Sequence, residues 1–369
     1  MRFLILSLLV MISAPAVAAP YNKDYFGETI IHKAVFEDTL IHLARKNALG
    51  FVELRAANPT LDPWIPGAGK RIILPKQNLL PDAPREGLVI NLAEMRVYYF
   101  KDEGKAPLTY PISIGREGLQ TPTGTTSIVR KKVGPEWRPT PRMRAEDPKL
   151  PAVVPAGPDN PLGTHAMYLG WPQYAMHGTN KPYGVGRRVS SGCIRMYPEN
   201  IVELFPLVPV GTKVTVVDQP VKVGWIDDKL YVEVSPTQDQ SLKIEEDGLV
   251  KSYEITADDM KRITKKAGSY ADKIDWGKVR KAVQEHRGYP VAVLDKNYAP
   301  GVSADNHMNE LLDEAGATDK DIKQIEKIVE KAEKEADTAK ETKTVSADDN
   351  ADKNSLMSRD SLSHPTFNN

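Results

Sequence analysis

The sequence lacks several features that would point to common classes of function. Its 369 residues contain a single cysteine and equal numbers of basic and acidic side chains, 49 of each. Without a net charge the chain has no overall field to attract nucleic acid, so we predict no nucleic-acid partner. It has no phosphate-binding loop or dinucleotide fingerprint, and its histidines have no Cys, Asp or Glu at metal-ligand spacing. The sequence therefore predicts neither a cofactor nor a metal site.

Long apolar runs are also scarce, and the one clear run lies at the start of the chain. Arg2 precedes an apolar stretch from Phe3 to Ile12, and residues 16–18 (Ala-Val-Ala) offer the small side chains that a signal peptidase recognises. We expect residues 1–18 to be a cleavable signal peptide and the mature chain to be exported. The alternative is an uncleaved membrane anchor, but the run is much shorter than the roughly 20 residues that span a bilayer.

Residues 28–76 are predicted to form a small α+β module. A β-rich stretch over 29–35 precedes a helix from Thr39, with Asp38 as the candidate N-cap. A second helix over 50–57 ends at Asn58-Pro59, and 71–74 forms the closing strand. This order and these residues resemble a LysM domain, which implies binding to the glycan strands of peptidoglycan. Glu37 stands where that family commonly has glycine, and a generic module without a sugar site is the alternative.

A mainly β domain is predicted over residues 87–218. Its β-rich runs are 88–91, 95–100, 108–114 and 213–217. Residues 131–163 interrupt these strands with eight prolines and little periodicity. Loops of this length inside a domain often form lids or binding loops, and Trp137 favours packing or substrate contact over a disordered insertion.

Residues 219–300 are predicted to form an α+β C-terminal subdomain. A hairpin over 223–234 is followed by two helices, one capped by Thr256 with Asp259 and one capped by Asp275. The remaining residues, 301–369, are polar, and an apolar seam from Ile322 to Ala332 suffices for one amphipathic helix. We expect a solvated, flexible tail, with a partner-binding helix as the alternative.

The single cysteine, Cys193, is informative because exported chains usually pair their thiols. It is either a small buried hydrophobe or a nucleophile, and a nucleophilic thiol needs an adjacent base. His177 lies sixteen residues earlier, so two neighbouring strands joined by the glycine-bearing loop 181–188 would bring the pair together. The backbone amides of Gly192 and Cys193 are candidates to hold an oxyanion.

The motif around these residues resembles that of the YkuD-type L,D-transpeptidases. His177-Gly178 is followed at 190–195 by Ser-Ser-Gly-Cys-Ile-Arg, which matches the family's [Ser/Thr]-x-Gly-Cys-x-[Arg/Asn]. Residues 121–124 (Thr-Pro-Thr-Gly) match its Thr-Pro-x-Gly turn, and the resemblance covers 87–218. The chain departs at Ser191, where many members carry histidine. The resemblance implies a YkuD-like β-sandwich, and the flanking segments resemble the subgroup that links the Braun lipoprotein to peptidoglycan.

The resemblance also implies roles for the two residues and a periplasmic location. Cys193 would attack the third residue of a peptidoglycan tetrapeptide stem, expel the terminal D-alanine and leave a thioester, while His177 acts as general base and then acid. The acyl acceptor stays open: it is a diaminopimelate amine, a lipoprotein lysine or water. Because the motif contains no Asp or Glu, we expect a backbone carbonyl or a hydroxyl to orient His177.

Five further residues are predicted near the substrate. Arg195 either binds a stem carboxylate or braces the loop through backbone carbonyls. The other candidates for the substrate groove, which would otherwise only pack under the lid, are Ser191, Trp137, Arg138 and Tyr168. Papain-like and NlpC/P60-type peptidases place cysteine before histidine, opposite to the order here. A non-catalytic wall-binding protein and an L,D-carboxypeptidase-type hydrolase remain the alternatives, and the sequence leaves the oligomeric state open.

Overall fold

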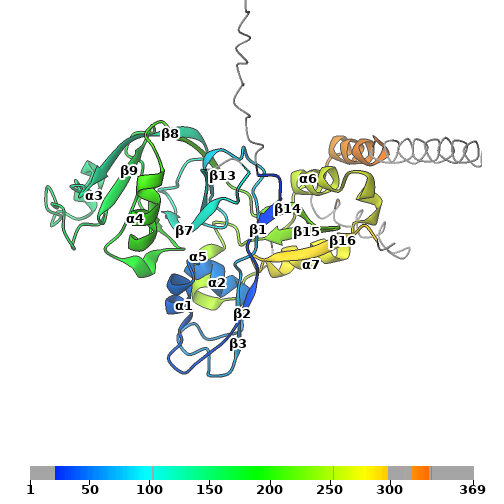
Figure 1. The fold of residues 1–369 in the computed structure, drawn as a ribbon, viewed down its shortest axis with the longest axis horizontal. Helices are drawn as coiled ribbons and strands as arrows, with labels where there is room; N and C mark the ends of the chain where they lie inside the picture. The colour runs from blue at the N-terminus through cyan, green and yellow to red at the C-terminus, as the bar shows by residue number, and fades with distance from the viewer. Residues whose placement is uncertain are drawn as a thin grey trace, which may run out of the picture.

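The computed structural model describes residues 21–101, 104–251, 253–297, 312, 317–331 and 334 (Figure 1). The predicted signal peptide and most of the predicted tail lie outside these residues. Within the described part, no helix combines the length and the apolar character needed to cross a membrane.

The N-terminal module has the predicted order of strand, helix, helix and strand. Its elements are β2 (Ile30–Lys33), α1 (Leu40–Lys46), α2 (Phe51–Ala57) and β3 (Arg71–Leu74). β2 and β3 pair antiparallel, and the two helices bury Leu40, Leu43 and Leu54 in a small core of their own.

The N-cap of α1 differs from the prediction. Thr39 caps the helix, because its side chain accepts a hydrogen bond from the His42 amide at 3.2 Å. Asp38 is engaged elsewhere, since its carboxylate contacts the His32 ring at 2.7 Å and accepts the Val35 amide at 2.8 Å.

The central domain is mainly β, as predicted, and is built on one nine-stranded sheet. Its strands are β5 (Gly87–Asn91), β6 (Arg96–Phe100), β7 (Leu108–Gly115), β8 (Gly124–Val133), β9 (His165–Leu169), β10 (Ala175–His177), β11 (Arg188–Ser190), β12 (Ile194–Met196) and β13 (Lys213–Val217). They are arranged in the order β11-β7-β12-β10-β9-β8-β13-β5-β6, and an extra β6–β7 pairing closes the sheet.

Two long strands change partners along their length and so fold the sheet into two facing halves. The first part of β7 pairs with β6, and its last residues pair with β12 and β11. Likewise, β8 begins against β13 and ends against β9. Apolar residues from both halves, among them Ile90, Val214 and Met176, share one buried core.

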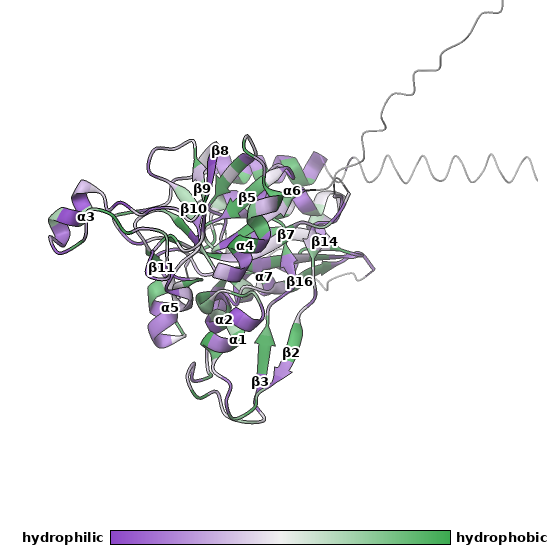
Figure 2. Cartoon of the chain, turned by 60° about the vertical axis from the view of Figure 1, so that its left-hand side comes forward, coloured by the Kyte–Doolittle hydropathy of each residue, from purple (hydrophilic) through white to green (hydrophobic). Residues whose placement is uncertain are grey.

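An arm and a helix complete this domain. The segment between β8 and β9, predicted as a lid, contains the short helix α3 (Pro141–Glu146), and Figure 2 shows this hydrophilic helix standing away from the body. The helix α4 (Pro198–Leu207) follows β12, and it buries Ile201 and Leu204. The sequence analysis did not predict α3 or α4.

The C-terminal subdomain is a three-stranded sheet covered by helices. The predicted hairpin, β14 (Val221–Ile226) and β15 (Lys229–Val234), gains a third strand, β16 (Pro290–Asp295). The covering helices are α6 (Ala257–Ala267) and α7 (Trp276–Glu285). The helix α5 (Ser241–Asp247) packs instead against α2, and its Ile244 is buried in the core of the central domain. The predicted caps of α6 and α7 are confirmed, because Thr256 and Asp275 both accept backbone amides.

The prediction of a solvated tail from residue 301 is wrong for residues 317–331. Residues 319–331 are helical, and Ile325 is fully buried in the core of the C-terminal subdomain. Asp321 pairs with Lys261 of α6 at 2.6 Å. The apolar seam therefore covers the chain's own subdomain, because α6 offers it an apolar face.

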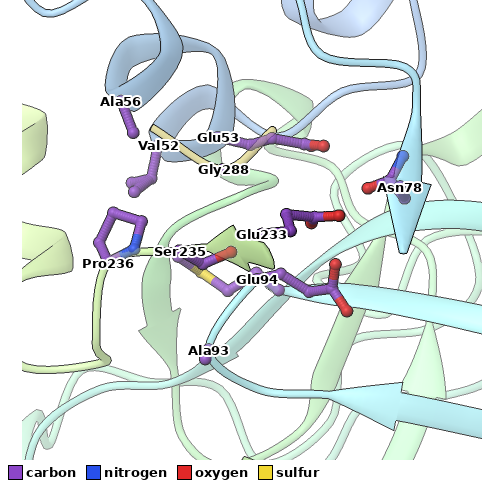
Figure 3. A pocket seen from close by; sticks show the side chains of 11 residues that line it. Val52, Glu53, Ala56, Asn78, Ala93, Glu94, Glu233, Ser235, Pro236 and Gly288 are labelled. Carbon is purple, nitrogen blue, oxygen red and sulfur yellow. The ribbon is translucent and has the colours of Figure 1, made fainter. Parts of the chain in front are cut away.

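A buried ionic cluster lies where the three parts of the chain meet. Lys222 of β14 contacts Glu94 at 2.6 Å and Glu233 of β15 at 2.7 Å, and all three side chains are almost fully buried. Figure 3 shows both carboxylates, with Glu53 of α2, around a cavity of about 10 Å³, which has room for about one water molecule. The parts are therefore joined by desolvated charges as well as by apolar contact.

Candidate active site

The sheet brings the predicted nucleophile and base together. β10 and β12 are parallel neighbours, with His177 opposite Arg195 and Met176 opposite Ile194. Continuing this register by one residue puts Cys193 beside Ala175. Since residues two apart on a strand face the same side, the side chains of Cys193, Arg195 and His177 share one face of the sheet.

His177 is held in a single tautomer by its own strand end. The imidazole is 3% exposed, and its Nδ1 lies 2.6 Å from the Gly178 carbonyl oxygen. A carbonyl only accepts, so Nδ1 carries the proton and Nε2 is the basic nitrogen. Burial lowers the pKa of His177 to about 4, the Gly178 carbonyl opposes this shift, and the charge of Arg195 adds to it. At neutral pH the ring is therefore an unprotonated base.

The thiol of Cys193 is protonated in the resting protein. Its Sγ donates to the Gln173 carbonyl at 3.4 Å. Burial raises the pKa of the thiol, and a hydrogen bond from the Ala175 backbone and the charge of Arg195 partly offset the increase. A standing thiolate–imidazolium pair is thus disfavoured, and the thiol must lose its proton when a substrate binds.

The turn before the cysteine is fixed by two hydroxyl groups. Ser190 Oγ accepts the Gly192 amide at 3.1 Å and donates to the Cys193 carbonyl at 2.5 Å. Thr121 Oγ1 donates to the Gly192 carbonyl at 2.8 Å. Gly192 has a φ of +103°, and a Cβ there would lie 2.9 Å from the Tyr174 ring, so this position requires glycine.

These contacts bear on which backbone amides could bind the oxyanion. In the structure the Gly192 amide donates to Ser190 Oγ at 3.1 Å, so it would have to leave this partner to bind an oxyanion, and that role stays a prediction. The Cys193 amide remains the candidate hydrogen-bond donor to the oxyanion.

A groove leads from the cysteine along the arm. Its volume is about 1280 Å³, above the 300–1,000 Å³ of usual small-molecule pockets, which fits an extended peptide. Five predicted residues lie along it: Cys193, Ser191, Trp137, Arg138 and Tyr168. His177 and Arg195 are not part of the groove wall.

The groove residues differ in what else they contact. Trp137 exchanges two backbone hydrogen bonds with Val154, at 2.9 and 2.8 Å, and so braces the arm. Arg138 pairs with Glu136 at 2.9 Å. The Tyr168 ring lies 3.7 Å below the Arg130 guanidinium, an arrangement that holds this cation at the groove wall.

Arg195 is half-buried beside the thiol. Within the described part of the chain, its buried Nε has no hydrogen-bond partner. Because this atom is buried and Arg195 does not line the groove, its two expected roles, binding a stem carboxylate and bracing the loop, both stay predictions.

The sequence analysis missed several groove and turn residues. Arg130 and Lys132 are two residues apart on β8, and both line the groove. Lys131, between them, lies on the other side of the strand and donates to the Phe205 and Val208 carbonyls. Strict alternation along a strand is the signal that would have found them. Thr121 and Ser190 belong to the sequence motif, but the motif alone does not indicate that their hydroxyl groups hold the turn before Cys193. Among the described residues, no three His, Cys, Asp or Glu side chains are grouped to hold a metal ion.

A mainly β domain with a cysteine and a buried neutral histidine on adjacent strands, beside a cationic peptide-sized groove, is typical of a cysteine enzyme. The model of the YkuD L,D-transpeptidase catalytic domain matches residues 85–216. The probable L,D-transpeptidase YcfS of Escherichia coli K12 is 42% identical over 238 residues, 61% of this chain and 74% of that protein. The probable L,D-transpeptidase ErfK/SrfK of Salmonella typhimurium is 39% identical over 68% of this chain and 81% of that protein. The chain belongs to the YkuD family and is an L,D-transpeptidase.

A similar solved structure is the NMR structure of the catalytic domain of an Enterococcus faecium L,D-transpeptidase. It is 25% identical and covers 37% of this chain and 99% of that chain, with a TM-score of 0.29.

Proposed function

We propose that the chain is exported to the periplasm and acts on tetrapeptide stems of peptidoglycan through a thioester on Cys193. The observation that carries this proposal is the placement of Cys193 and His177 on one face of two parallel neighbouring strands, next to the groove.

In the first half-reaction, His177 Nε2 takes the thiol proton as Cys193 Sγ attacks the carbonyl of the third stem residue. The Cys193 amide stabilises the oxyanion. The tetrahedral intermediate collapses, the C–N bond to D-alanine breaks, and His177 returns its proton to the leaving amine. A neutral thiol and a neutral imidazole suit this sequence, because the proton moves only when the carbonyl is in place.

In the second half-reaction, an amine attacks the thioester. His177 accepts the amine proton and passes it to the departing Cys193 sulfur, which restores the resting thiol. A diaminopimelate amine would cross-link two stems, a lipoprotein lysine would anchor a protein, and water would give the hydrolase alternative.

The charge of the groove supports an anionic peptide as the donor. Four basic side chains line it, Arg130, Lys132, Arg138 and Arg142, against one acidic side chain, Glu136. A groove with an excess of positive charge concentrates and orients carboxylate-bearing ligands. Arg195, whose charge acts on the Cys193 thiol, adds to the positive potential at this end of the groove.

The N-terminal module supports action at the wall. Its strand, helix, helix and strand order is that of a LysM domain, and we propose that it holds the glycan strands. Phe36 and Trp64, 86% and 58% exposed, provide apolar contact area on this module.

Product masses test the function. The mature protein is incubated with disaccharide tetrapeptides, with and without a peptide that ends in lysine, and the products are weighed. We expect release of D-alanine and stem dimers or peptide conjugates, and their ratio identifies the acceptor. Intact tetrapeptide after prolonged incubation would contradict the proposal.

A further inference from the structure

The N-terminal module contacts the loop that lies between His177 and Cys193 in the sequence. Residues 181–188 join β10, which holds His177, to β11, and Cys193 follows five residues later. One side of this loop is fixed to the sheet, because Ser113 Oγ donates to the Gly184 carbonyl at 2.7 Å and the Gly186 amide donates to Ile112 O at 3.2 Å.

The other side of the loop is fixed by the start of α2. The amides of Phe51 and Val52 donate to the carbonyls of Val185 and Gly186, at 3.5 and 3.2 Å. The first amides of a helix have no partner within it, so the catalytic domain supplies acceptors that the module lacks. The Arg187 guanidinium lies over the Phe51 ring at 4.1 Å, which adds a stacking contact to the same joint.

Two glycines allow the backbones to meet. A Cβ on Gly50 would lie 2.9 Å from Gly186 Cα, and a Cβ on Gly186 would lie 2.3 Å from Gly50 Cα. The joint therefore has no room for a side chain. A second contact supports it: Arg45 of α1 makes a bidentate pair with Glu199, at 2.9 and 3.0 Å, six residues after the cysteine.

We propose that the N-terminal module positions the loop of residues 181–188, and through it the segments that carry His177 and Cys193. Turnover then depends on docking of the module even for a substrate that contains no sugar. This inference rests on the proposed function of Cys193 and goes beyond glycan binding by the module. Gly50, Phe51 and Arg45 are positioning residues, since they touch the loop and α4 and not the substrate. A flexible tether that only delivers the enzyme to the wall would have no such effect.

The test uses the full chain and a soluble, sugar-free tetrapeptide. Gly50→Val inserts a side chain into the joint, and Gly184→Ala is its control on the same loop, because a Cβ there meets only Val189 at 3.6 Å. We expect Gly50→Val to lower kcat about tenfold or more, with KM within about twofold, since small misplacements remote from the chemistry have effects of this order. Gly184→Ala should match the wild type.

Exchanging the charges of the Arg45–Glu199 pair distinguishes a positioning effect on kcat from a loss of folding. Arg45→Glu should lower kcat by about threefold, as expected for a partly exposed pair, and Glu199→Arg in the same chain should restore it. Full kcat in both Gly50→Val and Arg45→Glu, or no restoration in the exchanged pair, would overturn the inference. Failure of the proposed function is distinct, because the wild type itself would then release no D-alanine from the same peptide.

Discussion

At the scale of single residues, the resting site holds its proton on sulfur. Burial lowers the pKa of His177 and raises that of Cys193, so both groups are neutral near pH 7. Such a pair resists oxidation better than a standing thiolate would, because the thiolate is the reactive form of cysteine. If the chain is exported, as proposed above, this arrangement protects its single thiol from oxidation.

The pKa of His177 gives a dependence of stability on pH. Its value is about 4 in the folded chain against 6.5 unperturbed, so the unfolded state binds more protons between these values and stability rises with pH across that window. The neutral His177 ring contributes about 3 kcal/mol to the free energy of unfolding. This contribution is complete above pH 6.5 and is lost as the pH falls to about 4. Urea unfolding at several pH values should show a shallower acid decline for His177→Gln. Parallel curves for the two proteins would contradict this.

Thr121 should control the turn before the nucleophile. Thr121→Val removes the hydroxyl that donates to Gly192 O and accepts the Gly115 amide, which leaves two buried groups unpaired. We expect a loss of about 1–3 kcal/mol in unfolding free energy and a fall in kcat of about tenfold or more. Thr121→Ser, which keeps the hydroxyl, should retain both properties in the same assays. Equal effects of serine and valine would show that the hydroxyl is not responsible.

The sequence allowed the His177–Cys193 pair to be predicted, because a motif with fixed spacing implies neighbouring strands. It did not predict that the Gly192 amide bonds Ser190 Oγ. That contact depends on the side-chain rotamer of Ser190, which no sequence pattern specifies.

At the scale of elements, β8 presents its cations on alternate sides. Arg130 and Lys132 line the groove, whereas Lys131 caps carbonyls at the end of α4. The strand thus separates a binding face from a structural face, as period-two alternation requires.

The binding face of β8 should determine affinity for the acyl donor. Arg130→Gln with Lys132→Gln removes two positive charges from the groove, and we expect KM for an anionic tetrapeptide to rise about tenfold with kcat nearly unchanged. Added salt should weaken binding by the wild type more than by the variant. Lys149→Gln, exposed on the arm and outside the groove wall, is the control. An unchanged KM and salt dependence in the double variant would contradict a role for these cations.

The helices that could be predicted carry explicit caps, such as Thr256 with Asp259 before α6. α4 was missed because Pro198 and Pro206 weaken its helical pattern, although Pro198 occupies the first turn, where proline is tolerated. β16 was missed because it starts with a proline, and its pairing with β15 is a long-range contact. Local patterns contain no information about such partners.

At the scale of the whole molecule, Lys222 joins the C-terminal subdomain to the central domain and to the segment that follows the N-terminal module. The lysine also donates to the Leu79 carbonyl at 2.7 Å, in the segment that follows the N-terminal module. Burial raises the pKa of Glu233 to about 7, and the neighbouring Lys222 opposes the shift. The packing of these segments against one another therefore depends on a single buried cation, Lys222.

Removal of that cation should weaken the whole fold. Lys222→Met leaves Glu94 and Glu233 facing each other without a counter-charge, so we expect a loss of about 3–5 kcal/mol in unfolding free energy at neutral pH. Lys229→Met, a half-exposed lysine of the same hairpin, should cost less than about 1 kcal/mol. Equal stability of the two variants would contradict a structural role for the cluster.

The central claim is that the stem is transferred through Cys193. Intact-protein mass spectrometry after brief mixing with a tetrapeptide, followed by peptide mapping, tests it most directly. The account predicts a mass increase equal to the donor minus D-alanine, carried as a thioester on Cys193, and no increase in Cys193→Ala. Release of D-alanine by Cys193→Ala at the wild-type rate, or an adduct on any other residue, would contradict it.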